Sequence, residues 1–317
     1  MKKIEHRPFR WASVFAIIMA FSVTFVLLDT FVIPRAGTPM ATKSTTAATV
    51  AAATASPSSG VSGTVKATTQ NTPVITSTSY KDANIQITIE TVRKYDTTLY
   101  VADIQVSSVD YLKTAFAKGT YGRNIKETTS TMAADNHAVF AINGDYYGFR
   151  DYGFVLRNGI LYRSNTLKSG NSEALAIDSL GNFSIVNENT TNAQSLADSD
   201  AWQVLSFGPT LINAGKITVT TSSEVGQSMT SNPRTAIGQV SALHYIFIVS
   251  DGRTSESAGL SLLELAQEFS ARGCAVAYNL DGGGSATMWF NGQVVNHPTD
   301  GRSTAERSVS DIVYIGY

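Results

Sequence analysis

The chain has 317 residues, a formal net charge of −1 and only 15% charged residues. A balance so close to neutral lacks the basic surface with which nucleic-acid-binding proteins neutralise phosphates, so no nucleic acid is expected as a partner. The one cysteine, Cys274, excludes an intrachain disulfide, and no pair of His or Cys residues has the spacing of a zinc site. These counts leave the oligomeric state open.

The N-terminus has the composition of a membrane anchor. Residues 1–10 are basic, and residues 11–33 form an apolar run in which Asp29 is the one charge. About 23 residues at 1.5 Å each can span a bilayer. Basic residues before the run predict a cytoplasmic N-terminus and a C-terminal part outside the cell. We therefore expect a single-pass signal anchor, with a cleaved signal peptide and a secreted protein as the alternative.

Residues 34–79 are rich in Thr, Ser and Ala, with scattered Pro and Gly. Such a segment has too few large apolar side chains to bury a core, so it predicts a disordered spacer that holds a domain away from the membrane. Residues 80–317 remain, and their length suits one large domain.

Most of this domain has the pattern of short β-strands. β-Branched residues, short apolar runs and Asn-Gly turns predict hairpins, the plainest being the one with Asn158-Gly159 between two apolar runs. The expected strands, in chain order, are 85–90, 99–106, 138–142, 154–157 with 160–162, 174–177 with 183–186, 202–207 with 211–219, 234–240, 245–249, 274–280, 288–290 with 294–295, and 311–317.

One helix is expected, over residues 262–272. Ser261 and Glu264 form a capping-box pattern, and Gly273 suits the helix end. The flanking strands 245–249 and 274–280 should then run parallel, joined by a right-handed crossover. The fold class expected is mixed α/β (α+β), a large β-rich domain with several antiparallel hairpins and one βαβ unit.

Two acidic residues follow the ends of these parallel strands. Asp251 follows the first strand and Asp281 follows the second, so both should lie on one rim of the sheet, where ligands of open α/β sheets bind. Gly282, Gly283 and Gly284 come next, and their N–H groups can form an anion-binding nest. The alternative is that both segments are simple polar turns.

Four parts of the chain together have a family pattern. They are Ala141–Tyr147, Phe207–Pro209, Asn232–Gly238, and Ser250–Arg253 together with Asn279–Ser285. In this order and spacing they resemble the phosphodiester glycosidase family over about residues 138–317. The resemblance implies hydrolysis of the bond between an anomeric carbon and a phosphodiester oxygen, giving free sugar and a phosphomonoester. Bacterial members are often described as exopolysaccharide-associated, which implies an envelope or exopolysaccharide polymer as substrate.

This chemistry requires a carboxylate near the anomeric carbon and cations near the leaving phosphate. On the resemblance, Asp281 is the expected catalytic carboxylate, Asp251 is a second acid or a sugar-orienting ligand, and Arg234 is the first phosphate clamp. The expected substrate-binding residues are Asn143, Asp145, Tyr146, Gly282, Gly283, Gly284, Ser285, Glu306 and Arg307. His297, near Asp300, is a weaker acid–base candidate.

Structural roles are the alternatives for several of these residues. Arg234 can pair with an acid at a strand end, Glu306 and Arg307 can form an exposed salt-bridged turn, and Tyr146 can be a packing residue. No cofactor is required by the sequence, although Asp145, Asp251 and Asp281 together offer oxygen ligands for Ca²⁺ or Mg²⁺. Two other functions stay open: a non-catalytic cell-wall glycan-binding module, and a metal-dependent phosphodiesterase that cuts the P–O bond.

Overall fold

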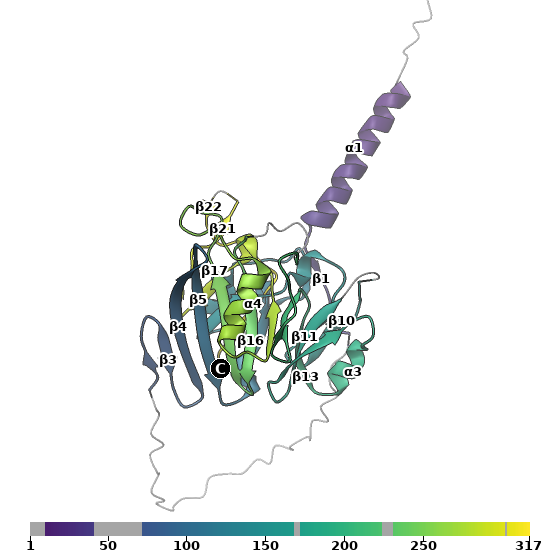
Figure 1. Cartoon of the computed structure of the whole chain (residues 1–317). Helices are drawn as coiled ribbons and strands as arrows, with labels where there is room; N and C mark the ends of the chain where they lie inside the picture. Colours follow the sequence, from purple (N-terminus) through teal and green to yellow (C-terminus); the bar gives the residue numbers. More distant parts are fainter. Residues whose placement is uncertain (1–9, 41–71, 168–171, 224–230, 302) are drawn as a thin grey trace, which may run out of the picture.

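The computed structural model describes residues 10–40, 72–167, 172–223, 231–301 and 303–317. A long apolar helix, α1 (Arg10–Phe31), projects from one large β-rich domain (Figure 1). Residues 1–9 of the predicted basic segment 1–10 and the middle of the predicted spacer, 41–71, lie outside the described residues.

The largest sheet has nine strands, and all of its ladders are antiparallel. The longest pair is β4 with β5, in which Ile85 faces Val106 and Lys94 faces Thr97. In order across the sheet the strands are β15 (Lys216–Ile217), β14 (Thr210–Asn213), β18 (Val276–Asn279), β16 (Thr235–Ser241), β17 (His244–Ser250), β5 (Thr97–Val106), β4 (Ile85–Lys94), β3 (Ser79–Lys81) and β2 (Val74–Ile75).

Two five-stranded sheets pack against this large sheet. One contains β20 (Gln293–Val294), β19 (Met288–Phe290), β8 (Phe140–Asn143), β23 (Asp311–Ile315) and β6 (Leu112–Phe116). The other contains β10 (Ile160–Arg163), β9 (Val155–Arg157), β13 (Ala201–Leu205), β11 (Glu173–Asp178) and β12 (Phe183–Asn187). Two small ladders complete the described strands: β1 (Arg35–Ala36) with β7 (Gly122–Arg123), and β21 (Thr299–Asp300) with β22 (Ser303–Thr304).

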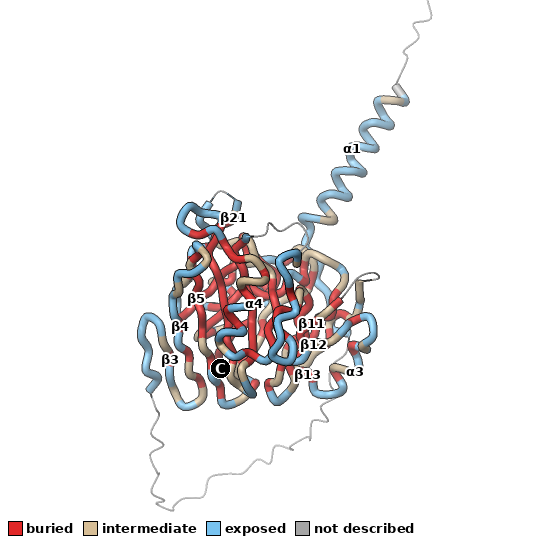
Figure 2. Tube along the Cα trace, in the orientation of Figure 1, coloured by how far each residue is buried: buried red, intermediate tan, exposed pale blue. Residues whose placement is uncertain are grey.

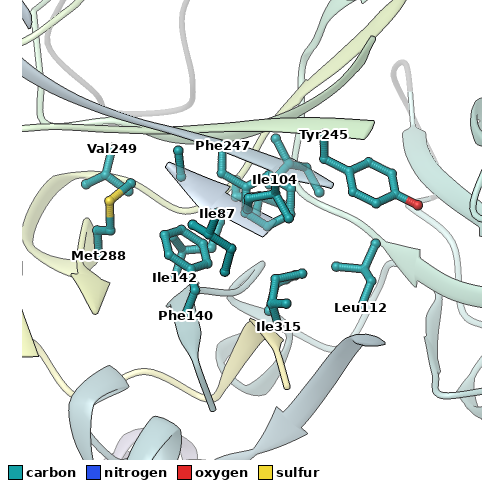
Figure 3. Packing of buried hydrophobic residues seen from close by; sticks show 14 of the residues in the cluster. Ile87, Ile104, Leu112, Phe140, Ile142, Tyr245, Phe247, Val249, Met288 and Ile315 are labelled. Atoms are coloured by element: carbon teal, nitrogen blue, oxygen red, sulfur yellow. The ribbon is translucent and has the colours of Figure 1, made fainter. Parts of the chain in front are cut away.

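The main core lies between the sheets (Figure 3). Ile87, Ile104 and Phe247 of the large sheet pack against Phe140 of β8 and Ile315 of β23, in the first of the two five-stranded sheets. Side chains alternate between the two faces of a strand, so every second residue of a strand enters this layer. Burial of large aliphatic and aromatic side chains here is the main favourable term in folding.

Helices cover the outer faces of the sheets. α4 (Leu262–Ala271) buries Leu265 and Phe269 against the face of the large sheet that carries Ile246 and Ile248. α2 (Thr129–Asp135) and α3 (Ala193–Asp198) cover the two smaller sheets in the same way. Both faces of the large sheet are therefore buried at its centre, which Figure 2 shows as a continuous buried interior.

The predicted fold class is confirmed, and so are most of the individual elements. The Asn158-Gly159 hairpin, the β11–β12 hairpin and the capping box of α4 all form. The predicted pairing of 202–207 with 211–219 is wrong. β13 lies in a five-stranded sheet and β14 lies in the large sheet, because the chain crosses between layers at Phe207–Pro209.

The strands on either side of α4 do run in the same direction, because each pairs antiparallel with β16. They are not neighbours, since β16 lies between them. Short helices α2 and α3 were not expected from the sequence, because seven or fewer residues show no helical period.

The two ends of the predicted spacer also differ from expectation. Arg35 and Ala36 pair with β7, and residues 74–81 form β2 and β3 at the edge of the large sheet. The folded domain therefore includes residues on both sides of segment 41–71.

Candidate functional site

Asp251 and Asp281 lie just past the ends of β17 and β18, on one rim of the large sheet, as the parallel direction of these strands predicted. The backbone N–H of Asp281 donates to the Gly144 carbonyl at 3.3 Å, which ties this rim to the end of β8. The rim therefore collects loops from two sheets, and it is the centre of the candidate site.

Asn143 holds the Asp281 segment in place. Its side-chain Nδ2 donates to the Asp281 carbonyl at 2.7 Å, and its Oδ1 accepts from Thr235 Oγ1 at 2.8 Å and from Thr287 N at 3.2 Å. The side chain is completely buried. Asn143 is thus placed to position Asp281, whereas the sequence had suggested direct contact with a sugar hydroxyl.

Asp281 is partly buried, so its carboxyl has only limited access to solvent. Burial raises its pKa to about 6, and Ser285, Arg307 and Arg150 oppose this shift. Because these groups are close enough to affect Asp281, the sequence-predicted residues Asp281, Ser285 and Arg307 do come together. A carboxyl whose pKa approaches neutrality suits acid–base or nucleophilic work.

The glycine loop brings cations next to this carboxyl. A side chain at Gly284 would place Cβ 2.7 Å from Arg307 Nη2, and one at Gly283 would place Cβ 2.8 Å from Arg253 Nη2, so both glycines allow close approach. Asp300 Oδ1 holds Arg307 by accepting from Nε at 3.0 Å and from Nη2 at 2.7 Å. The Arg307 side chain is still 42% exposed, so it can contact an anionic ligand.

Tyr146 lies close enough to Asp281 for the aspartate charge to act on its hydroxyl. Its backbone is left-handed, with φ at 72°, the residue is 39% exposed, and its ring stacks on Phe149 at 4.8 Å between centroids. Burial raises the pKa of its hydroxyl, and the Asp281 charge adds to the effect. An exposed aromatic face beside a carboxyl and an arginine is a suitable platform for a sugar ring.

Asp251 forms a pair with His297. Asp251 Oδ1 accepts from the His297 backbone N at 2.8 Å, and Oδ2 lies 3.1 Å from both His297 Nδ1 and the Tyr100 hydroxyl. The carboxylate is 9% exposed and the imidazole is 71% exposed. Asp251 thus fixes the orientation of an open imidazole, which is the arrangement of a histidine held for proton transfer.

Asp145 lies elsewhere, in a buried charge cluster. Its Oδ2 accepts from Arg157 Nη2 at 2.9 Å and from Ser206 N at 2.7 Å, and its Oδ1 accepts from Tyr147 N at 3.2 Å. The same guanidinium binds Asp311 at 2.9 Å. Burial, followed by the Asp145 charge, raises the pKa of Asp311, and Arg157 opposes this. Asp145 has no exposed surface, so the predicted contact with a sugar hydroxyl does not fit this arrangement.

Two other predicted site residues, Arg234 and Glu306, make contacts that are typical of a structural role. Arg234 is 2% exposed, and its Nε donates to the Leu260 carbonyl at 2.9 Å. Glu306 Oε1 accepts from Ser130 N at 3.0 Å in the first turn of α2, where a carboxylate favours the helix dipole. Arg307 and Arg253, not Arg234, are therefore the exposed arginines at the glycine loop.

Four residues near the site were not predicted from the sequence to have a role: Arg150, Arg253, Tyr100 and Asp300. Arg253 belongs to the Asp-Gly-Arg turn, so the motif itself could have indicated it. Tyr100 comes from the middle of β5 and Arg150 from an irregular loop, and neither has a local sequence signal. Arg150 Nη2 donates to the Asp145 carbonyl at 3.2 Å, which links the buried cluster to the site.

Within the described ranges, no group of three or more His, Cys, Asp and Glu side chains is placed to hold a metal ion. The three carboxylates proposed from sequence as a cation site do not converge, because Asp145 is bound to Arg157 and Asp251 to His297.

Comparison with known proteins identifies relatives over much of the chain. The sequence model of the family described as phosphodiester glycosidase matches residues 136–316. The SPbeta prophage-derived uncharacterized protein YomE of Bacillus subtilis is 29% identical over 202 residues, which cover 62% of this chain and 31% of that protein. N-acetylglucosamine-1-phosphodiester alpha-N-acetylglucosaminidase of mouse is 42% identical over 67 residues, 21% of this chain and 13% of that protein. The chain thus spans less than a third of the length of these relatives.

The fold is also found in solved structures. The zebrafish N-acetylglucosamine-1-phosphodiester alpha-N-acetylglucosaminidase catalytic domain, auto-inhibited by its pro-peptide, aligns with a TM-score of 0.58 and 19% identity, over 74% of this chain and 83% of that one. A hypothetical protein from Synechocystis aligns with a TM-score of 0.50 and 16% identity, over 73% of this chain and 62% of that one. At these identities the likeness concerns the fold.

Proposed function

This chain belongs to the phosphodiester glycosidase family, and we propose that it hydrolyses a sugar-1-phosphodiester outside the cytoplasm. Water adds to the anomeric carbon, the bond from that carbon to the phosphodiester oxygen breaks, and free sugar and a phosphomonoester leave. The proposed substrate is a phosphate-containing envelope polymer or exopolysaccharide. The apolar helix α1, whose length and composition suit a membrane span or a signal sequence, supports this location.

The observation that carries the proposal is the position of Asp281 beside the glycine loop. A partly buried carboxyl with a pKa of about 6 lies close to Arg307, and the glycines let the arginines approach the loop closely. Glycosidic cleavage needs this pairing, because positive charge develops on the sugar ring while negative charge develops on the leaving group.

Each side chain has a proposed role. The Asp281 carboxylate acts as nucleophile or as the base that activates water, and Arg307 with Arg253 binds the phosphate oxygens. A phosphate leaving group needs little protonation, so these cations do the main work at that end. His297, oriented by Asp251, is the proposed second acid–base group. Tyr146 offers its exposed ring to the sugar.

The first test uses the full chain in detergent or nanodiscs. It is incubated with UDP-GlcNAc and with methyl-phospho-GlcNAc, with and without EDTA, and free GlcNAc is measured. We expect sugar release that falls by about a thousandfold or more in Asp281→Asn. Asp110→Asn, at an exposed site, is the matched control and should retain the wild-type rate. Near-normal turnover by Asp281→Asn would refute the assigned role.

Hydrolysis in ¹⁸O-labelled water identifies the bond that breaks. The proposal expects the label in the released sugar. Label in the phosphate, together with loss of activity in EDTA, would indicate a metal-dependent phosphodiesterase instead. Binding to glycans with no product under any condition would indicate a non-catalytic wall-binding module.

A further inference from the structure

The segment that follows α1 lies on the folded domain. Arg35 and Ala36 form β1, which pairs antiparallel with Arg123 and Gly122 of β7. The Gly37 N–H donates to the Tyr121 carbonyl at 2.8 Å, and the Met40 N–H donates to the Leu161 carbonyl at 2.8 Å. We call residues 34–40 the strap. Its backbone hydrogen bonds reach two separate parts of the domain.

The C-terminal end of α1 also contacts the domain directly. Asn124 Nδ2 donates to the carbonyls of Thr30 and Ile33, both at 3.1 Å. The last carbonyls of a helix have no partner inside the helix, so a domain side chain here satisfies groups that would otherwise need water. Asp29, in the last turns of α1, pairs with Arg35 of the strap. The helix end, the strap and the domain are thus joined by side-chain contacts.

The strap rests on a cluster of aromatic rings. A side chain at Gly37 would place Cβ 2.7 Å from the Tyr121 ring, so only glycine lets the strap approach this closely. Tyr121 stacks on Tyr147, with centroids 5.3 Å apart and planes 15° apart, and it packs against Phe116 and Tyr162. Tyr147 is the neighbour of Tyr146, so the strap contacts a ring cluster adjacent to the candidate site.

The site and the base of α1 lie at the same end of the domain. β21, which contacts the glycine loop, lies at the upper end of the domain in Figure 1, and α1 leaves the domain at that end. If the strap were a free spacer, the domain would sample positions tens of ångströms from the membrane. The strap contacts remove that freedom and hold the site toward the membrane that α1 would cross.

We propose that the strap docks the glycosidase domain on its own membrane helix, so that the enzyme acts on lipid-linked sugar-1-phosphodiesters in the same membrane. This inference rests on the proposed function and names its substrate class. Enzyme and substrate are then confined to one surface, which raises the effective substrate concentration without new contacts.

Docking is tested by a disulfide in the full chain reconstituted in liposomes. Facing Cα atoms on antiparallel strands are about 4.5–5.5 Å apart, within disulfide range. The pair Arg35→Cys with Arg123→Cys should therefore oxidise to near completion. The control pair is Arg35→Cys with Lys81→Cys, because Lys81 belongs to β3 in the large sheet. Peptide mass spectrometry measures the yields, and equal yields for the two pairs would overturn docking.

The substrate class is tested with two probes: a dialkylglycerol-phospho-GlcNAc in the same liposomes, and soluble methyl-phospho-GlcNAc. Gly37→Val should undock the strap and lower the rate on the lipid-linked probe by roughly tenfold, with the soluble rate within about twofold of wild type. Asn124→Gly removes the helix-end contacts by a second route and should act in the same direction. Gly63→Val, in segment 41–71, is the matched control and should change neither rate.

The outcomes separate the two proposals. Equal rates on the lipid-linked probe for wild type, Gly37→Val and Asn124→Gly would overturn the role of the strap in bringing the enzyme to membrane substrates and leave the glycosidase function standing. Turnover of the soluble probe alone would overturn the lipid-linked substrate class and also leave the glycosidase function standing. Absence of turnover of either probe by the wild type would contradict the glycosidase function, and the cross-linking yields would then decide docking alone.

Discussion

Asp145 and Asp281 occupy comparable places in the chain and very different places in the molecule. Each follows a short buried strand and stands two residues after an asparagine, Asn143 or Asn279. Asp145 is fully buried, and both of its oxygens accept from donors of the protein itself. Asp281 is partly open and lacks such full compensation, so burial raises its pKa. The contrast teaches that a carboxylate whose oxygens are all bound by donors of the protein stabilises the fold. A carboxylate that keeps part of its surface open, with fewer such partners, is available for chemistry.

The largest expected effect comes from making the same substitution at both acids. Asp145→Asn leaves Arg157 with less buried negative charge and should lower the free energy of unfolding by about 3–5 kcal/mol. Asp281→Asn should raise it by about 1–2 kcal/mol at pH 8, because the folded-state pKa of about 6 lies above the unfolded value and ionisation therefore costs stability there.

Chemical denaturation at pH 8 and pH 4 measures both changes. Most of the gain from Asp281→Asn should be lost toward pH 4, where the aspartate is protonated in the folded state and about half protonated in the unfolded chain. Equal destabilisation by the two variants would break the comparison.

Arg307 provides the next test, because it lies near the partly open Asp281 and not in the buried cluster of Asp145. Arg307→Gln should raise KM for a sugar-1-phosphodiester by about 10- to 100-fold, since a charge-assisted contact to phosphate is lost. Steady-state kinetics on methyl-phospho-GlcNAc measures it. Arg272→Gln, which removes a guanidinium bound to Glu268 and Glu90 on α4 and β4, is the matched control. A KM that is unchanged in Arg307→Gln would exclude the phosphate role.

The pH dependence of catalysis sharpens the comparison further. Because the ionised form of Asp281 is the proposed reactive form, kcat/KM should fall about tenfold per pH unit below pH 6. Rates between pH 4.5 and 8 in a constant-ionic-strength buffer measure this. The residual rate of Asp281→Asn should lack the same inflection, and an inflection that persists there would assign it to another group.

The smallest effect is expected at Glu306, which the sequence placed in the site and whose carboxylate the structure places against the first turn of α2. Glu306→Ala removes the acceptor for Ser130 N and should cost about 1 kcal/mol of stability. Its kcat and KM should match those of the wild type, as measured on the same substrate. A raised KM with unchanged thermal stability would restore Glu306 to the site.

The parts that could be predicted from the sequence are those with local causes. The α4 capping box, the Asn158-Gly159 turn and the direction of β17 and β18 all depend on neighbouring residues. The proximity of Asp281 and Arg307 depends on β21 and the last strands, so hydrophobic periodicity could not predict it. The resemblance to the family did place both residues in one site.

Other features depend on contacts between distant parts of the chain. The role of Asp145 is set by Arg157 on β9 and Ser206 beyond β13, and the pairing of Asp251 with Tyr100 and His297 joins three separate loops and strands. Pairing of the strap with β7 leaves no pattern in a stretch as short as Arg35–Ala36. Composition predicted a spacer over residues 34–79, because the two residues that pair with β7 hardly change the average polarity of that segment.

The nine-stranded sheet ends at both edges in strands of two residues, β15 and β2. An exposed edge offers unpaired N–H and C=O groups to other chains, and a short edge limits that template. Without β2 and β3, the ten-residue strand β4, with Ile85, Ile87 and Ile89 in its sequence, would become the edge. Residues 74–81 hold none of the proposed chemistry, yet they cover β4, the outer strand of the longest ladder in this sheet, and so limit its pairing with other chains.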